Sequence, residues 1–108
     1  MAARLERRLL KKMNHPNIIS YYDDYEDINY IGIVMELMAN DLRQTMQQVG
    51  DGLDENFCRN ICKQLFEAVA YCHENQIIHR DIKMENILLD VDPNTQGLLV
   101  KLCDFGTA

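Results

Sequence analysis

The sequence has 108 residues, of which 47% are hydrophobic and 26% are charged, and its formal net charge is -6. This length allows one small domain, and the hydrophobic content excludes a disordered tail. The acidic balance argues against non-specific nucleic-acid binding, which needs many Lys and Arg contacts to phosphate. One basic cluster departs from this balance, and we interpret it as the solvated face of a helix: Arg4, Arg7, Arg8, Lys11 and Lys12.

The cysteines and the hydropathy pattern bear on the compartment. None of the four cysteines has C-x-x-C spacing, and the zinc signatures are absent. Cys58 and Cys62 would share one face of a helix, so we interpret them as buried free thiols in a reducing compartment. No signal peptide or membrane-spanning run is visible. We therefore expect an intracellular, cytoplasmic protein that binds neither nucleic acid nor membrane.

The first predicted element is a helix over residues 3–13. Its apolar residues recur at three- and four-residue spacing, as on one helix face: Leu5, Leu9, Leu10 and Met13. Pro16 ends it, because the residue before a proline avoids helical angles. Glu6 lies among the basic residues, and its simplest role is an intrahelical ion pair with Arg or Lys.

Two strands and two helices are predicted next. Residues 17–25 and 28–37 are rich in Ile, Val and Tyr, and Glu26-Asp27 separates them. Core positions on the second strand would be Ile31, Ile33 and Val34. A short helix would start at Leu42, with Asp41 as a possible N-cap, and would end at Gly50-Asp51-Gly52.

The long helix is predicted over residues 55–75, with Asp54 as its cap. It carries an apolar stripe with a period of 3.6 residues, typical of a core helix: Phe57, Cys58, Ile61, Cys62, Leu65, Phe66, Val69 and Cys72. We assign no chemistry to this stripe.

Two polar motifs follow, joined by a predicted hairpin. The first is His79-Arg80-Asp81-Ile82-Lys83-Met84-Glu85-Asn86, and the second, Asp104-Phe105-Gly106, begins eighteen residues after Asn86. Between them lie two short apolar runs, Ile87-Leu88-Leu89 and residues 98–102, around a turn at residues 92–97. Such a hairpin would bring Asn86 close to Asp104.

These residue types suit phosphoryl transfer, which needs a carboxylate beside the attacking hydroxyl, metal ions on the phosphates and a cation for developing charge. Asp81 can be the carboxylate. Lys83 lies two residues on, so in an extended loop it points to the same side. Asn86 and Asp104 offer the oxygen ligands that Mg2+ prefers.

The first motif resembles the catalytic loop of protein kinases, H-R-D-x-K-x-x-N, and the second resembles their magnesium-binding D-F-G. The resemblance implies an incomplete, α+β protein kinase-like fold, with residues 1–37 in the small lobe and 38–108 in the large lobe. It implies a serine/threonine kinase that transfers the γ-phosphoryl group of ATP to Ser or Thr hydroxyls of a protein substrate. ATP and Mg2+ would be the cofactors, and Lys83 favours serine/threonine over tyrosine specificity.

The same resemblance assigns roles at the site. Asp81 would be the base, Lys83 the charge stabiliser, and Asn86 and Asp104 the magnesium ligands. Glu6 would pair with a strand lysine of the small lobe. A hydrophobic column would contain Leu10, Tyr21, His79 and Phe105.

For the nucleotide, the resemblance implies a connector, Glu36-Leu37-Met38, whose backbone would bond the adenine, with Met35 guarding the pocket behind it. Leu88 would form the floor under the adenine, and Asp41 would lie near the ribose unless it serves only as a cap. Cys103 would face the ATP pocket, either as an accessible thiolate or as a buried, inert thiol.

The kinase pattern also contains a Gly-rich loop and a strand lysine upstream, and an activation segment downstream, which these 108 residues do not include. We therefore expect the chain to be a fragment that is inactive alone, because losing one transition-state contact commonly costs about 10^2-fold in rate. The alternative is a short pseudokinase-like module that binds or regulates another protein. We also expect the lower side of the long helix to be exposed, giving marginal stability or self-association.

Overall fold

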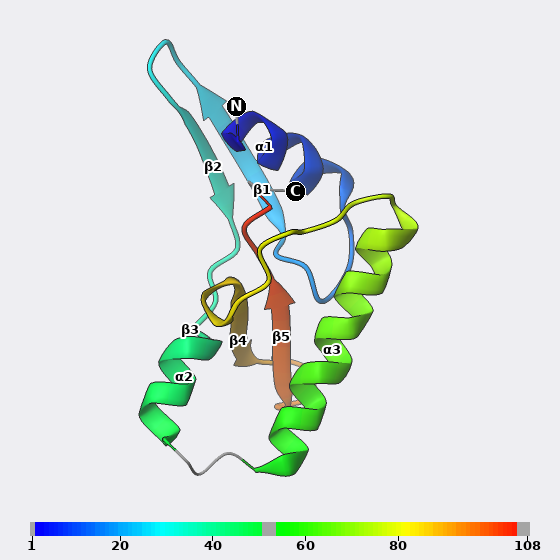
Figure 1. Ribbon diagram of the computed structural model, residues 1–108. Helices are drawn as coiled ribbons and strands as arrows, with labels where there is room; N and C mark the ends of the chain where they lie inside the picture. Colours follow the sequence, from blue (N-terminus) through cyan, green and yellow to red (C-terminus); the bar gives the residue numbers. More distant parts are fainter. Residues whose placement is uncertain (1, 51–53, 106–108) are drawn as a thin grey trace.

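The computed structural model describes residues 2–50 and 54–105. Its elements are α1 (Ala2–Lys12), β1 (Tyr21–Glu26), β2 (Ile31–Met35), β3 (Asn40–Asp41), α2 (Leu42–Val49), α3 (Glu55–Glu74), the 3-10 turn η1 (Met84–Asn86), β4 (Ile87–Val91) and β5 (Leu98–Leu102). The expected α+β architecture is confirmed. The molecule is elongated, with extents of 47 × 28 × 27 Å. Figure 1 shows the β1–β2 hairpin at one end and α2 at the other.

Two antiparallel sheets form the framework. One contains β1 and β2, and the other has the strand order β3-β4-β5. In Figure 1, α1 lies beside the β1–β2 hairpin and α3 runs along β5. The β4–β5 pair is in register from Ile87 opposite Leu102 to Val91 opposite Leu98, so the predicted hairpin is confirmed.

The segment before β1 joins the two sheets. The strand predicted from residue 17 begins only at Tyr21, because residues 17–19 run beside β5. The amide of Ile19 donates to the Leu102 carbonyl at 3.1 Å, and the Leu102 amide donates to the Asn17 carbonyl at 2.8 Å. The local pattern was strand-like, but its partner is a strand some eighty residues further on.

The turn between β1 and β2 is wider than predicted. Asp27 accepts hydrogen bonds from the amides of Asn29 and Tyr30, at 2.8 and 3.1 Å, and so closes an Asx turn. Ile28 is fully exposed there, so the strand predicted over residues 28–37 is only Ile31–Met35. Val34 is 48% exposed and was wrongly expected in the core, because it alternates with Ile33, which packs against the core.

Side-chain and backbone caps fix the ends of the two later helices. Asp41 accepts the Gln44 amide at 2.8 Å to start α2, and the Gly50 amide donates to the Met46 carbonyl at 2.9 Å where α2 ends. Asp54 caps α3 by accepting the Asn56 amide at 3.3 Å, as predicted. Asp51, Gly52 and Gly106, which belong to predicted turns and motifs, lie outside the described residues.

The hydrophobic core follows β5 and the face of α3 that packs on it. The buried apolar residues are Leu10, Ile18, Ile19, Ile61, Ala68, Cys72, Ile77, Ile87, Leu89, Val100, Leu102 and Phe105. On the opposite face of α3, Phe66 is 70% exposed. Cys58 and Cys62 are exposed too, so their interpretation as buried thiols was wrong, whereas Cys72 is buried. In the described residues, no helix is long and apolar enough to cross a membrane.

Candidate active site

The loop between α3 and β4 gathers three of the predicted catalytic side chains. Asn86 is buried, and its Nδ2 donates to the Asp81 carbonyl at 2.9 Å and approaches Asp81 Oδ2 at 3.5 Å. The Lys83 ammonium lies 3.5 Å from the same Asp81 oxygen. Asp81 is half-buried, so one carboxylate lies at the solvent boundary between a cation and an amide.

A contact with α2 holds the other end of this loop. Arg43 forms an ion pair with Glu85 at 2.7 Å, next to Asn86. Neither residue was singled out in the sequence, because a surface charge pair between distant segments leaves no local pattern. Both side chains are largely exposed, so the pair adds only a modest stabilisation to the loop.

The hairpin brings the second motif beside the first. The Cys103 amide donates to the Asn86 carbonyl at 3.0 Å, which places Asp104 one residue beyond that bond. Asp104 is exposed and has a left-handed backbone, with φ of 61°. Asp tolerates this conformation better than most residues, and such outliers cluster at functional positions.

His79 links the two motifs. Its Nδ1 accepts the Asp81 amide at 3.1 Å, and its Nε2 lies 2.8 Å from the Cys103 carbonyl. Nδ1 is therefore the acceptor of the ring, and Nε2 is the nitrogen that donates to the carbonyl. The ring also packs edge-on against Phe105 with centroids 4.7 Å apart, and Tyr21 packs on the same cluster as Leu10. The four members of the predicted column therefore lie in one region.

Glu6 reaches the second motif from α1. Its Oε2 accepts the Phe105 amide at 3.1 Å. Burial raises the pKa of Glu6 above its ordinary value, against the lowering effect of that hydrogen bond, and nearby Asp104 adds to the rise. The intrahelical ion pair is therefore not the contact that orients this carboxylate.

The connector, Glu36-Leu37-Met38, is anchored by an ion pair with a lysine that the sequence analysis missed. Glu36 forms an ion pair of 2.5 Å with Lys101 of β5 and accepts the Ser20 amide at 2.8 Å. Burial pushes the pKa of Glu36 up, but these bonds outweigh it, and the pKa lies below its ordinary value. The sequence did contain a signal for this contact, because Lys101 is a charged residue within the apolar run that forms β5.

The remaining predicted nucleotide contacts lie at the end of β2, in the segment that follows it, in β3 and β4, and directly after β5. Met35 is 37% exposed at the end of β2, and Met38 packs partly against the core. Asp41 pairs with Leu88 across β3 and β4. Burial, aided by the charges of Asp104, Glu6 and Asp41, raises the pKa of the Cys103 thiol to about 11. Of the two readings of Cys103, this favours the inert thiol.

The donor atoms near the loop fit a hard cation. Asn86 commits its amide nitrogen to Asp81, so its carbonyl oxygen is the atom that can act as a ligand beside Asp104. Mg2+ commonly takes one or two protein oxygens and completes its shell with water and phosphate. In residues 2–50 and 54–105, no group of three or more His, Cys, Asp or Glu is arranged as a complete metal cage.

Comparison with known proteins shows the family of the chain. The protein kinase domain matches residues 1–108. The chain is 38% identical over 107 residues to human NUAK family SNF1-like kinase 2, covering 98% of this chain and 16% of the relative. It is 41% identical over 105 residues to the protein kinase domain-containing protein ppk9 of Schizosaccharomyces pombe, covering 95% of this chain and 19% of the relative. It therefore belongs to the protein kinase domain family and spans less than a fifth of those relatives' length.

Proposed function

We propose that the chain is the central part of a serine/threonine protein kinase that transfers the γ-phosphoryl group of ATP to a protein substrate. The observation that carries the proposal is the arrangement of Asp81, Lys83 and Asn86, with Asp104 one residue beyond the Cys103–Asn86 bond. Its residues supply a base, a cation and two oxygen ligands, the parts that phosphoryl transfer requires.

Asp81 orients the attacking hydroxyl and accepts its proton. Its backbone is held on both sides, by Asn86 Nδ2 on the carbonyl and by His79 Nδ1 on the amide, and its carboxylate lies 3.5 Å from Asn86 Nδ2, so little reorganisation is needed when a substrate arrives. Lys83, 3.5 Å from that carboxylate, is the cation for the charge that develops on the transferred group. Lys83 is also the residue that favours a Ser or Thr acceptor over Tyr.

Asn86 and Asp104 would hold Mg2+, which when bound neutralises the phosphates of ATP. Leu88 would lie under the adenine, and the backbone at Glu36 and Met38 would bond its edge. Asp41 would serve the ribose while it caps α2, and Met35 would limit the depth of the pocket. Glu6 would face a lysine of the small lobe, with its carboxylate already turned toward Phe105.

The test uses the longer natural protein that contains this sequence. We expect Mg2+-dependent transfer from ATP to Ser and Thr peptides and much slower transfer to the matched Tyr peptide. Asp81→Asn should lower the rate by at least about 10^2-fold, because an amide cannot accept the proton. Glu74→Gln, at the exposed end of α3, is the matched control and should leave the rate unchanged. Equal rates for Asp81→Asn and Glu74→Gln would refute the proposal.

A further inference from the structure

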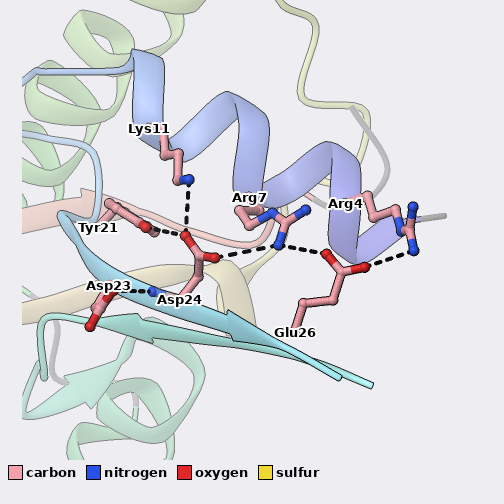
Figure 2. A network of polar contacts seen from close by, with 7 residues as sticks. All are labelled: Arg4, Arg7, Lys11, Tyr21, Asp23, Asp24 and Glu26. Atoms are coloured by element: carbon pink, nitrogen blue, oxygen red, sulfur yellow. Dashed lines mark hydrogen bonds and ion pairs between the residues drawn. The ribbon is translucent and has the colours of Figure 1, made fainter. Parts of the chain in front are cut away.

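The basic face of α1 meets an acidic strand. Arg4, Arg7 and Lys11 lie three and four residues apart, so they share one side of the helix. β1 has the sequence Tyr-Tyr-Asp-Asp-Tyr-Glu and presents Asp24 and Glu26 to that side. Figure 2 shows the side chains of the two elements pointing toward one another. The solvated face expected for this cluster is therefore, in part, a contact surface.

The contacts alternate between the two elements. Arg4 pairs with Glu26 at 2.9 Å, and Arg7 pairs with Glu26 at 3.0 Å and with Asp24 at 3.4 Å. Lys11 continues the series to Asp24 at 3.1 Å. We call these five residues the α1–β1 ladder. Asp24 also accepts a hydrogen bond from the hydroxyl of Tyr21. Of the two carboxylates in the ladder, that of Asp24 therefore has more polar partners.

The centre of the ladder is shielded from solvent, unlike an ordinary surface pair. The side chains of Arg7 and Asp24 are only 23% and 15% exposed, against 61% for Arg4. Hydrogen bonds from Tyr21 and Lys11 hold the pKa of Asp24 below its ordinary value. Networks of several charges with shielded members contribute more than isolated exposed pairs.

Apolar packing holds only one part of α1. Among the α1 side chains that the structure describes, Leu10 alone is buried, and it lies toward the C-terminal end of the helix. Glu6 is on the preceding turn, adjacent in sequence to Arg7. The ladder contacts of Arg7 therefore restrain the turn that carries Glu6, in addition to the packing of Leu9 and Leu10 on the core.

We propose that Arg7 and Asp24 are positioning residues, which hold α1 so that Glu6 reaches the Phe105 amide. The ladder lies on one side of α1 and the Glu6–Phe105 bond of 3.1 Å on another, so the helix transmits the restraint. Strand β1 is thereby coupled to the D-F-G segment through charge. The importance of Glu6 for catalysis rests on the proposed function, but the coupling itself does not.

The test is amide hydrogen exchange at Phe105 in the 108-residue chain, with the Leu102 amide of β5 as an internal reference. Arg7→Met removes the ladder charge but keeps an apolar stem. We expect it to speed Phe105 exchange about tenfold relative to Leu102, the effect of losing a hydrogen bond to a charged acceptor. Arg8→Met removes an equal charge from an exposed position on the same helix and should change neither amide. Arg7→Lys should restore most of the protection.

Salt gives a second test, because the distance over which charges interact falls from about 10 Å at 0.1 M to about 3 Å at 1 M ionic strength. High salt should speed Phe105 exchange in the unaltered chain and have little further effect in Arg7→Met. Equal Phe105 exchange in Arg7→Met and Arg8→Met, an unprotected Phe105 amide in the unaltered chain, or a parallel rise at Leu102 would each overturn the positioning role. Ladder-dependent exchange in the 108-residue chain, together with no kinase activity in the longer natural protein, would refute the proposed function alone.

Discussion

Replacing Lys101 by Met tests the ion pair that fastens the connector to β5. The side chains of Lys101 and Glu36 are 10% and 17% exposed, so removing the cation leaves a nearly buried carboxylate. Breaking a buried pair from one side costs about 3–5 kcal/mol, and residual exposure favours the lower end, about 3 kcal/mol. In a domain with about 5–15 kcal/mol of total stability, that is a large fraction.

The measurement is urea unfolding of the 108-residue chain, as a double-mutant cycle with Glu36→Met. The double variant should cost only about 1 kcal/mol, because two apolar side chains replace two charges and the main remaining loss is the acceptor of the Ser20 amide. The coupling energy should therefore be at least about 2 kcal/mol. Arg59→Met, which breaks an exposed pair with Glu55, is the control and should cost less than about 0.5 kcal/mol.

The free energy of unfolding should also decrease at low pH. Because the folded pKa of Glu36 lies below its ordinary value of 4.5, the contribution of this carboxylate is complete above pH 4.5 and is lost as the pH falls through the folded pKa. Additive variants, with coupling near zero, would refute the account of the ion pair. If Lys101→Met is unfolded in water, a folded double variant still demonstrates the coupling.

Three further predictions concern the whole chain, its thiols and its core. The 108-residue chain alone should transfer no phosphate, because it lacks the Gly-rich loop and the strand lysine; measurable transfer to a generic protein substrate would contradict this. Iodoacetamide at pH 8 should label Cys58 and Cys62, which are exposed, well before Cys103, whose pKa is about 11; mass spectrometry of the peptides decides the order. Leu102→Ala should lower the free energy of unfolding by about 2–5 kcal/mol, because Leu102 is fully buried; a smaller loss in urea unfolding would mean that the site collapses.

The elements with a clear local pattern could be predicted from the sequence. The period of the apolar residues gave α3 to within a residue, and the hairpin of β4 and β5 followed from two apolar runs around a turn. The motif spacing also predicted that Asn86 and the D-F-G segment meet, because a hairpin brings the residue before its first strand close to the residues after its second strand. Each of these features depends on interactions between residues that are close in the chain.

What the sequence did not predict depends on distant partners. Lys101 and Glu36 are 65 residues apart, so the sequence shows a lysine within an apolar run but not which carboxylate it meets. Asn17 reads as the start of a strand, but its side chain donates to the Val100 carbonyl at 2.9 Å and its backbone bonds β5. For Cys58, the period of the helix was correct, but it shows only which residues share a face, not which face is covered.

The pairing of residues 17–19 with β5 sets an order for folding. The Asn17 carbonyl accepts a hydrogen bond from the Leu102 amide, so the core is fully paired only when both this segment and β5 are present. During synthesis, Ile18 and Ile19 leave the ribosome long before Val100 and Leu102 exist to cover them. Contacts of such long sequence separation form slowly, and the early hydrophobic segment stays exposed to aggregation or chaperones meanwhile. The contact that unites the two sheets is therefore one of the last to become possible on a nascent chain.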